Sequence, residues 1–265
     1  MLVNLSEKIA VVTGGAGNIG PHLVKSLYDS GAIVYVLLKP GTSNDHSLEM
    51  LKNITGIYFL ECDILDFDEL TNVSSILNKK HGQLDLLVAN AGIDAPPPAN
   101  SDYNNNGKIN FYDPLEFSKI INVNLCGTFN TLIAFGKLME HRGGSIILMG
   151  SLYSMVSPDP SFYSHIIPEF IKSPAYSASK AGIAQLGRFF AAHWGKYKIS
   201  INTLSPGGVA GKQDVKFVEK YINRVPMKRM CCCADICNAI LFLASESSRY
   251  ITGINLFLDG GFSSM

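Results

Sequence analysis

A tyrosine and a lysine stand four residues apart in the stretch Tyr176-Ser177-Ala178-Ser179-Lys180. On a helix this spacing places both side chains on one face, about one turn apart. A free tyrosine, with a pKa of about 10, is a poor base at neutral pH, but a neighbouring ammonium favours the phenolate. The pair could therefore exchange a proton with a hydroxyl or a carbonyl, although a lone Tyr-x-x-x-Lys is more often an exposed helix face.

A glycine-rich turn near the start of the chain has the order that a phosphate loop needs. It joins an apolar run at residues 9–12 to a helical pattern. Gly14 permits a sharp exit from a strand, Gly20 lets a helix lie close to a sheet, and the helix start directs N–H groups toward a pyrophosphate. Asn18 stands where the pattern has glycine, and its amide could reach a phosphate oxygen. Taken alone, the turn fits either a dinucleotide site or a structural turn.

Two periodicities alternate along the rest of the chain. Apolar runs typical of buried strands occupy residues 9–12, 33–38, 57–61, 84–90, 145–149, 200–204 and 255–258. Helical spacing occurs at residues 23–28, 47–54, 67–81, 114–141, 174–197 and 235–245. The alternation predicts an α/β fold, a single Rossmann-type doubly wound domain over residues 1–265. We expect a seven-stranded parallel sheet with helices on both faces.

Two irregular segments interrupt this alternation. Residues 94–113 contain three consecutive prolines and an Asn-Asn-Asn-Gly run, and residues 157–173 contain three aromatic residues and His165. Both follow strands, so both should emerge at the carboxyl ends of the strands, where open α/β sheets bind ligands. We expect them to be inserted loops that border a binding site.

Composition excludes several classes of partner. Lys plus Arg and Asp plus Glu both number 22, so the formal net charge is zero, and 47% of the residues are apolar. No basic patch indicates nucleic acid, and no apolar stretch reaches the roughly 18 residues of a membrane-spanning helix. The amino terminus lacks the pattern of a signal peptide. We expect a cytoplasmic protein whose partner is a small-molecule substrate.

Cysteines are concentrated in one place, at Cys231, Cys232, Cys233 and Cys237. A metal site would need a second pair of ligands at the spacing usual for zinc, and none is found in the sequence. The favoured interpretation is a set of small apolar side chains that lead into a helix, with no metal bound.

Further motifs follow the glycine turn at regular distances. In order they are Thr13-Gly14 with Gly20, Cys62-Asp63-Ile64, Asn90-Ala91-Gly92, Asn122-Val123-Asn124, Ser151, Tyr176 to Lys180, Pro206-Gly207 and Asp259-Gly260-Gly261. With this set the chain resembles the short-chain dehydrogenase/reductase family over nearly its whole length. A single glycine loop is unspecific, but the ordered set is strongly specific.

The resemblance implies roles for four residues. Tyr176 would exchange the proton with the substrate, and Lys180 would lower the pKa of Tyr176 and hold the nicotinamide ribose. Ser151 would hydrogen-bond the reacting oxygen, and Asn124 would support a water relay to Lys180. Ser151 lies 25 residues before Tyr176, about twice the usual family distance. Ser164 is closer to the usual spacing, but Ser151 follows a strand and is preferred.

The resemblance also implies the residues that contact the cofactor. They are Gly14, Asn18, Ile19 and Gly20 at the pyrophosphate, Asp63 and Ile64 at the adenine, and Asn90, Ala91 and Gly92 beside the ribose; Pro206, Gly207 and Val209 border the nicotinamide, and Tyr176 and Lys180 complete the set. The threonine that often binds the carboxamide is missing here, so backbone groups or Gln213 would replace it.

The choice of cofactor depends on the residue after the second strand. An acidic residue there would select NAD, but this chain has Leu38 followed by Lys39. Lys39, helped by Thr42 or Ser43, could pair with the 2′-phosphate of NADP. We therefore expect NADP in preference to NAD, unless Lys39 is only a solvated loop lysine.

A narrower resemblance concerns the substrate. The stretches at residues 152–159 and 204–209 are similar to family members encoded with flagellin or surface-polysaccharide sugar modification. A sugar or nucleotide sugar is therefore expected, read by polar loop residues such as Tyr103, Asn104, Asn105, Asn106, Asp159, Tyr163 and His165. Alternatives are an acyl or steroid-type ketone, a cofactor-binding regulatory module without turnover, and a nucleotide-sugar epimerase or dehydratase. Relatives are commonly tetramers, so a homo-oligomer, dimer or tetramer, is expected.

Overall fold

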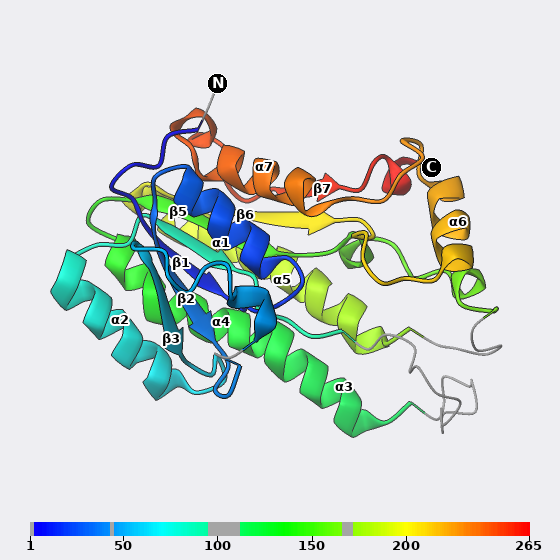
Figure 1. The fold of residues 1–265 in the computed structure, drawn as a ribbon, viewed down its shortest axis with the longest axis horizontal. Coiled ribbons are helices and arrows are strands. Elements are labelled where there is room, and N and C mark those ends of the chain that lie inside the picture. Colours follow the sequence, from blue (N-terminus) through cyan, green and yellow to red (C-terminus); the bar gives the residue numbers. More distant parts are fainter. Residues whose placement is uncertain (1–2, 43–44, 95–111, 166–171) are drawn as a thin grey trace.

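The computed structural model describes residues 3–42, 45–94, 112–165 and 172–265 (Figure 1). Its centre is a seven-stranded sheet in the order β3-β2-β1-β4-β5-β6-β7, in which every neighbouring pair is parallel. The strands are β1 Ile9–Thr13, β2 Ile33–Leu38, β3 Ile57–Glu61, β4 Leu86–Ala89, β5 Gly144–Met149, β6 Ile199–Pro206 and β7 Asn255–Leu258. The predicted fold class is confirmed.

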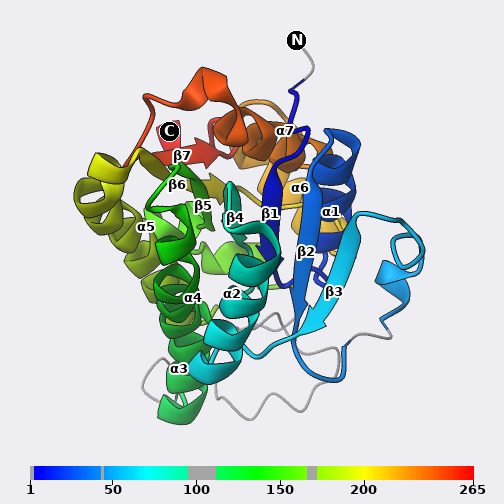
Figure 2. The same cartoon turned by 90° about the vertical axis from the view of Figure 1, so that its left-hand side faces the viewer.

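Helices cover both faces of this sheet. They are α1 Gly20–Asp29, α2 Phe67–His81, α3 Pro114–Ile121, α4 Gly127–Gly136, α5 Pro174–Trp194, α6 Val215–Arg224 and α7 Cys233–Ala244. Figure 2 shows α2, α4 and α5 on one side of the strands and α1 and α7 on the other. Because both faces are covered, the central strands are apolar at consecutive positions instead of alternating. All five residues of β1 are buried.

The helix expected at residues 47–54 is wrong. The structure has a 3-10 turn at His46–Leu48, followed by further turns up to β3. Leu48 and Leu51 are buried, but Met50 is 85% exposed. So short a segment gains too little from burying two side chains to stabilise a regular helix.

Helix α6 was missed by the sequence analysis. Asp214 caps it, because the side chain of Asp214 accepts a hydrogen bond from the backbone N–H of Phe217 (3.1 Å). Figure 1 shows α6 beyond the tip of β6. The helix buries Phe217 and Tyr221 against the segment after β5 instead of the sheet.

Residues 114–141 were expected to form one helix. Most of them are helical, but they do not form a single regular helix. A π-helical turn at Asn122–Cys126 separates α3 from α4, and a 3-10 turn follows at Lys137–Met139. π-Turns of this kind often occur at functional sites. This one carries Asn124.

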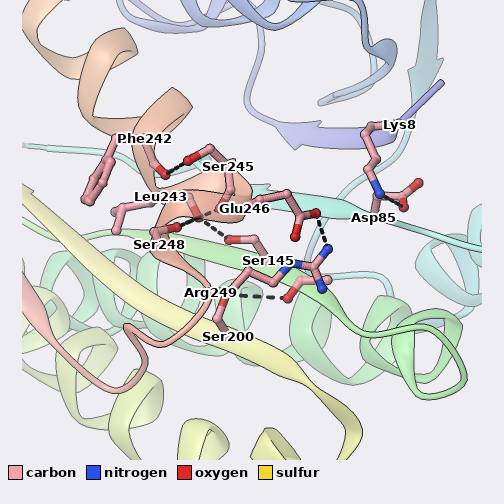
Figure 3. Close-up of polar contacts among 11 residues, drawn as sticks. Lys8, Asp85, Ser145, Ser200, Phe242, Leu243, Ser245, Glu246, Ser248 and Arg249 are labelled. Carbon is pink, nitrogen blue, oxygen red and sulfur yellow. Dashed lines mark hydrogen bonds and ion pairs between the residues drawn. The ribbon is translucent and has the colours of Figure 1, made fainter. Parts of the chain in front are cut away.

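The amino-terminal edge of the sheet is closed by polar contacts (Figure 3). Lys8 pairs with Asp85 at 3.0 Å between Nζ and Oδ1, and Arg249 pairs with Glu246. The Ser145 hydroxyl donates to the carbonyl of Leu243 (2.7 Å). A cavity of about 510 Å³ opens among these residues, at the edge opposite to the cofactor motifs.

Among the described residues, no helix is both long and apolar enough to cross a membrane.

Candidate active site

A cavity of about 660 Å³ lies at the carboxyl edge of the sheet, where parallel α/β folds bind ligands. It brings together most of the site residues expected from the sequence: Gly14, Asn18, Ile19, Lys39, Asp63, Ile64, Asn90, Ala91, Gly92, Ser151, Tyr176, Lys180, Pro206, Gly207 and Val209. Gly20 and Asn124 are buried behind this lining. The volume is in the range of small-molecule and cofactor sites.

Hydrogen bonds join the segments that follow β1 and β4 at their carboxyl ends. The Asn90 side-chain amide donates to the carbonyls of Thr13 (3.1 Å) and Gly14 (3.0 Å). The backbone N–H of Ala91 donates to the Thr13 hydroxyl (3.0 Å). Gly14 has φ +68°, and a Cβ on it would lie 2.6 Å from the Ala91 Cα. Only glycine fits this position, because a side chain would be strained and would collide with backbone.

The glycine turn brings α1 close to the sheet without side chains in between. A Cβ on Gly20 would lie 2.3 Å from the carbonyl oxygen of Gly15. Among the described residues, positive φ outside glycine occurs only at Glu7, Lys198 and Lys228, so Asn18 has an ordinary backbone. The missing glycine at position 18 therefore carries no backbone strain. A Cβ on Gly17 would meet only the Gly14 carbonyl oxygen, at 3.4 Å, and Gly14, Gly17 and Asn18 line the cavity, so the turn leaves room there for a pyrophosphate.

The hydroxyl groups of Ser151 and Tyr176 are hydrogen-bonded to each other in the cavity. Ser151 follows β5, and its oxygen also accepts the backbone N–H of Tyr153 (3.2 Å). Lys180 lies one turn after Tyr176 on α5, with Nζ 5.6 Å from the centre of the tyrosine ring. The expected helix face is thus buried in the site instead of being exposed to solvent.

Ser164, the alternative serine, lies elsewhere. Its hydroxyl donates to the carbonyl of Ser161 (3.1 Å) and accepts from Lys220 (3.1 Å). It is exposed and does not line the cavity. The geometry therefore favours Ser151 as the partner of Tyr176.

Burial controls the electrostatics of this group. It raises the pKa of Tyr176 above the usual tyrosine range, and the charge of Asp94 raises it further, while the hydrogen bond with Ser151 lowers it. Burial likewise lowers the pKa of Lys180 to about 8, against an opposing effect of Asp94. The sequence led us to expect a lowered tyrosine pKa, but the cost of burying the phenolate raises the pKa of Tyr176 instead. The surroundings favour the protonated phenol.

Asn124 holds the backbone that borders the cavity. Its side-chain oxygen accepts the backbone N–H of Ile93 (2.7 Å), and its amide nitrogen donates to the Ile93 carbonyl (2.9 Å) and the Ser179 hydroxyl (3.1 Å). A Cβ on Gly92 would lie 3.2 Å from the Asn124 side-chain oxygen and 3.4 Å from Lys180 Nζ. The side chain therefore positions the strand exit beside Lys180, and a water relay through Asn124 stays a prediction.

Two of the three residues expected at a 2′-phosphate, Lys39 and Thr42, line the cavity. Lys39 is exposed and lines the cavity. The Thr42 hydroxyl donates to the Lys39 carbonyl (2.7 Å), and Ser43 lies outside the described residues. Asp45, which the sequence analysis did not consider, also lines this end of the cavity. Both signs of charge are therefore present where the cofactor type would be selected.

At the other end, Gln213 is bound within its own loop. Its side-chain oxygen accepts the Gly211 N–H (2.7 Å), and its amide donates to the Val209 carbonyl (2.8 Å). It lines the cavity but serves first to shape the loop after β6. Its expected contact with a carboxamide stays a prediction.

Three of the polar residues expected to read a sugar, Asp159, Tyr163 and His165, pack against α6 and its cap and do not line the cavity. His165 bonds to Asp214 (2.7 Å between Nε2 and Oδ1), and Asp159 pairs with Arg224 (2.9 Å). The ring of Tyr163 lies 5.2 Å from that of Phe217. These contacts latch residues 157–165 to α6. Tyr103, Asn104, Asn105 and Asn106 lie outside the described residues.

The cysteine run forms the start of α7. Cys232 caps the helix, and the Asp235 carboxylate accepts the Cys232 backbone N–H (2.9 Å) in a reciprocal capping box. In the described part of the chain, no three His, Cys, Asp or Glu side chains are grouped as a metal site would require.

Comparison with known proteins identifies the family. A family model described as enoyl-(acyl carrier protein) reductase matches residues 14–263. The chain belongs to the short-chain dehydrogenase/reductase family. It is similar to a 3alpha-hydroxysteroid dehydrogenase of Mediterraneibacter gnavus, with 31% identity over 270 residues and 98% of each protein covered.

Two solved structures are similar over almost the whole chain. A short chain dehydrogenase from Leptospira borgpetersenii with bound NAD+ has a TM-score of 0.83 and 29% identity, covering 97% of this chain and 93% of that one. A gluconate 5-dehydrogenase from Burkholderia cenocepacia in complex with NADP and tartrate has a TM-score of 0.83 and 25% identity, covering 100% and 98%. The protein is thus an NAD(P)-dependent oxidoreductase of hydroxyl or carbonyl substrates.

Proposed function

We propose that Tyr176 is the acid–base catalyst of this oxidoreductase, with Ser151 and Lys180 as its partners. The observation that carries the proposal is the hydrogen bond between the Ser151 and Tyr176 hydroxyls inside the cavity, with Lys180 Nζ 5.6 Å from the tyrosine ring. A general acid or base must lie within hydrogen-bond reach of the reacting oxygen, and these two hydroxyls define one such point.

Each residue has a separate part in the proposed reaction. The nicotinamide of the cofactor gives or takes the hydride. In reduction, the Tyr176 phenol gives its proton to the substrate oxygen while the Ser151 hydroxyl donates a hydrogen bond to the same oxygen. Lys180 Nζ donates to the carbonyl of Met149 (2.8 Å), which leaves further N–H groups for the ribose. Burial favours the protonated phenol, which is the form that gives a proton in carbonyl reduction.

The test is Tyr176→Phe, assayed by the absorbance of the reduced nicotinamide on a panel of ketones and alcohols. The variant should lose hydride transfer by at least about 100-fold, the usual contribution of a positioned acid–base group, and should still bind cofactor. Tyr35→Phe is the matched control, since Tyr35 is also a buried tyrosine but bonds to His81 (2.8 Å) on the outer part of the sheet. Substantial turnover by Tyr176→Phe would refute the assignment.

We further propose NADP as the preferred cofactor, on the strength of the Lys39 ammonium at the edge of the cavity. Lys39→Ala should weaken NADPH binding by about 10-fold, equivalent to about 1.4 kcal/mol, and leave NADH binding nearly unchanged. Asp45→Asn should improve NADPH binding in the same titration. Equal affinity of the wild type for both cofactors would remove the role of Lys39.

A polar, hydroxylated substrate such as a sugar or nucleotide sugar is proposed in place of an apolar ketone. The support is the polarity of the reacting end of the cavity, with Asp94, Ser151 and Lys180, and the likeness to a gluconate dehydrogenase. The likeness to a hydroxysteroid dehydrogenase supports the apolar alternative. The place in flagellin or surface-polysaccharide modification rests on the resemblance at residues 152–159 and 204–209. A panel of aldonates, sugars and hydroxysteroids decides between the classes.

Two other functions make different predictions. A regulatory module would bind cofactor without turnover on any member of the panel. An epimerase or dehydratase would convert substrate with no net change in cofactor absorbance. The intact Ser151, Tyr176 and Lys180 group argues against the first of these.

A homo-oligomer, dimer or tetramer, is proposed from the outer surface of α4 and α5. This surface exposes Phe129 (44%), Ile133 (39%) and Phe189 (54%). Exposed apolar groups of this kind mark protein–protein contacts. Light scattering should give a mass above that of one chain, and Phe189→Glu should shift it toward the monomer. We also propose that the protein is cytoplasmic. Fractionation of cells that express the protein tests this location.

A further inference from the structure

A second lysine faces the proposed catalytic tyrosine. Lys172 lies just before α5, with Nζ 5.5 Å from the centre of the Tyr176 ring, as close as that of Lys180 (5.6 Å). Its side chain is only 7% exposed. Nothing in the family motif accounts for it, since Tyr176 and Lys180 complete that motif without it. A charged side chain this deeply buried needs a partner.

That partner is Asp94, which follows β4. The Lys172 ammonium and the Asp94 carboxylate form an ion pair, and the carboxylate is 39% exposed in the cavity lining. The neighbouring Ser173 is 1% exposed and accepts a hydrogen bond from the Tyr112 hydroxyl (2.6 Å). The backbone that carries Lys172 is therefore anchored from a second side. The Lys172–Asp94 ion pair is therefore held in place at the cavity by the surrounding structure.

We propose that Lys172 is a positioning residue that tunes the acid strength of Tyr176 by neutralising Asp94. The inference rests on the proposed acid–base role of Tyr176. An isolated carboxylate near the phenol would oppose its ionisation, whereas an isolated ammonium would favour it. As a pair, the Lys172 ammonium offsets part of the effect of the Asp94 carboxylate on the phenol. The effective acidity of Tyr176 is then set by burial, by the part of the Asp94 charge that Lys172 leaves uncompensated, and by Ser151.

Other charged groups around Tyr176 do not duplicate this pair. On α3, which packs against α5, Glu116 and Lys119 pair with each other (3.5 Å) and are exposed. Tyr163, from the segment after β5, raises the pKa of Tyr176 less than Asp94 does. Within the described ranges, the groups that face the phenol are thus Lys180, Lys172, Asp94, Tyr163 and, beside Tyr163, Tyr153.

Removing each charge separately should move the pH profile in opposite directions. Asp94→Asn leaves Lys172 alone, so the apparent pKa for alcohol oxidation should fall. Lys172→Met removes the ammonium and keeps the Asp94 carboxylate, so the apparent pKa should rise. Each shift should be about one pH unit, the lower end of the roughly 1 to 3 units that a charge within about 4 to 6 Å produces. The double variant should lie between the two, and Lys172→Arg should restore the wild-type profile.

A matched ion pair lies at the other edge of the sheet. Lys8→Met breaks the pair of Lys8 with Asp85, shown in Figure 3, by the same replacement of a lysine. It should leave the pH profile in place. A purely structural role of Lys172 would lower kcat in both single variants without opposite shifts. Shifts in one direction, or none, would overturn the proposal.

A measurement without turnover separates this proposal from the proposed function. Tyrosine labelled with ¹³C at Cζ is titrated by NMR in the intact protein with oxidised NADP present, and the Tyr176 signal is the one missing from Tyr176→Phe. The pH at which it moves should increase in the order Asp94→Asn, wild type, Lys172→Met. If no substrate turns over but this order holds, only the proposed function fails. If substrates turn over and the order does not hold, only the tuning fails.

Discussion

Replacing Asn124 by alanine tests whether this side chain holds the strand exit beside the cavity. The substitution removes three hydrogen bonds, two to the Ile93 backbone and one to Ser179. Asn124 is 0% exposed, so water cannot replace them without rearrangement. At about 1 kcal/mol net for each bond, the free energy of unfolding should fall by about 3 kcal/mol. That is a large part of the roughly 5–15 kcal/mol typical of a domain.

The assay is urea unfolding followed by the fluorescence of Trp194, the single tryptophan. Asn130→Ala is the matched control, because Asn130 donates one hydrogen bond, to the Ile64 carbonyl (3.2 Å), and should cost only about 1 kcal/mol. Cofactor affinity should also fall in Asn124→Ala, since Ile93 and Gly92 border the cavity. A loss no greater than that of the control would refute the positioning role.

Three further outcomes follow from the same structure. Gly14→Ala should lower the free energy of unfolding by at least about 1 kcal/mol and abolish tight cofactor binding. The reason is that it adds a side chain at φ +68° with its Cβ 2.6 Å from Ala91 Cα. Urea unfolding measures the first effect and cofactor titration the second. Gly136→Ala should cost about 1–3 kcal/mol and change Trp194 fluorescence, since its Cβ would lie 2.3 Å from that ring; an unchanged spectrum would contradict this. Burial lowers the pKa of Lys180 from 10.5 to about 8, so between these pH values the unfolded chain binds more protons and the free energy of unfolding rises with pH. Lys180→Met should lack this rise, and parallel stability curves for variant and wild type would contradict it.

Local sequence patterns were sufficient for the strands and most helices. Strand β2, for example, has apolar side chains at consecutive positions, and nearly all of them are buried because helices cover both faces of the sheet. An unbroken apolar run of this length therefore already indicated a strand covered on both faces. Residues 47–54 failed because helical spacing over so few residues does not decide between a helix and a series of turns. Helix α6 was missed although the sequence carries a signal for it: Asp214 stands at the cap position, and Phe217 and Tyr221 follow at helical spacing.

The site was predictable to the extent that its residues belong to ordered motifs. Ser151, Tyr176 and Lys180 were found from spacing and strand position, and the structure places all three at one cavity. Lys172 and Asp94 were not found, because they are 78 residues apart and no local pattern joins them. The loop residues Asp159 and His165 were expected to face substrate, but Arg224 on α6 and its cap residue Asp214 hold them elsewhere.

The amino-acid sequence by itself determined the order of the strands along the chain and the glycines at which backbones approach closely, and it led to the Tyr176–Lys180 pair that we propose for proton exchange. These depend on residue types and on periods of a few residues, which the chain carries wherever it folds. Only the tertiary structure decided that burial raises the pKa of Tyr176 and that Asn124 binds the Ile93 backbone. It also decided that Lys172 lies beside the Tyr176 ring while it is paired with Asp94. Electrostatic energies and hydrogen bonds depend on which distant segments meet and on how much water remains between them.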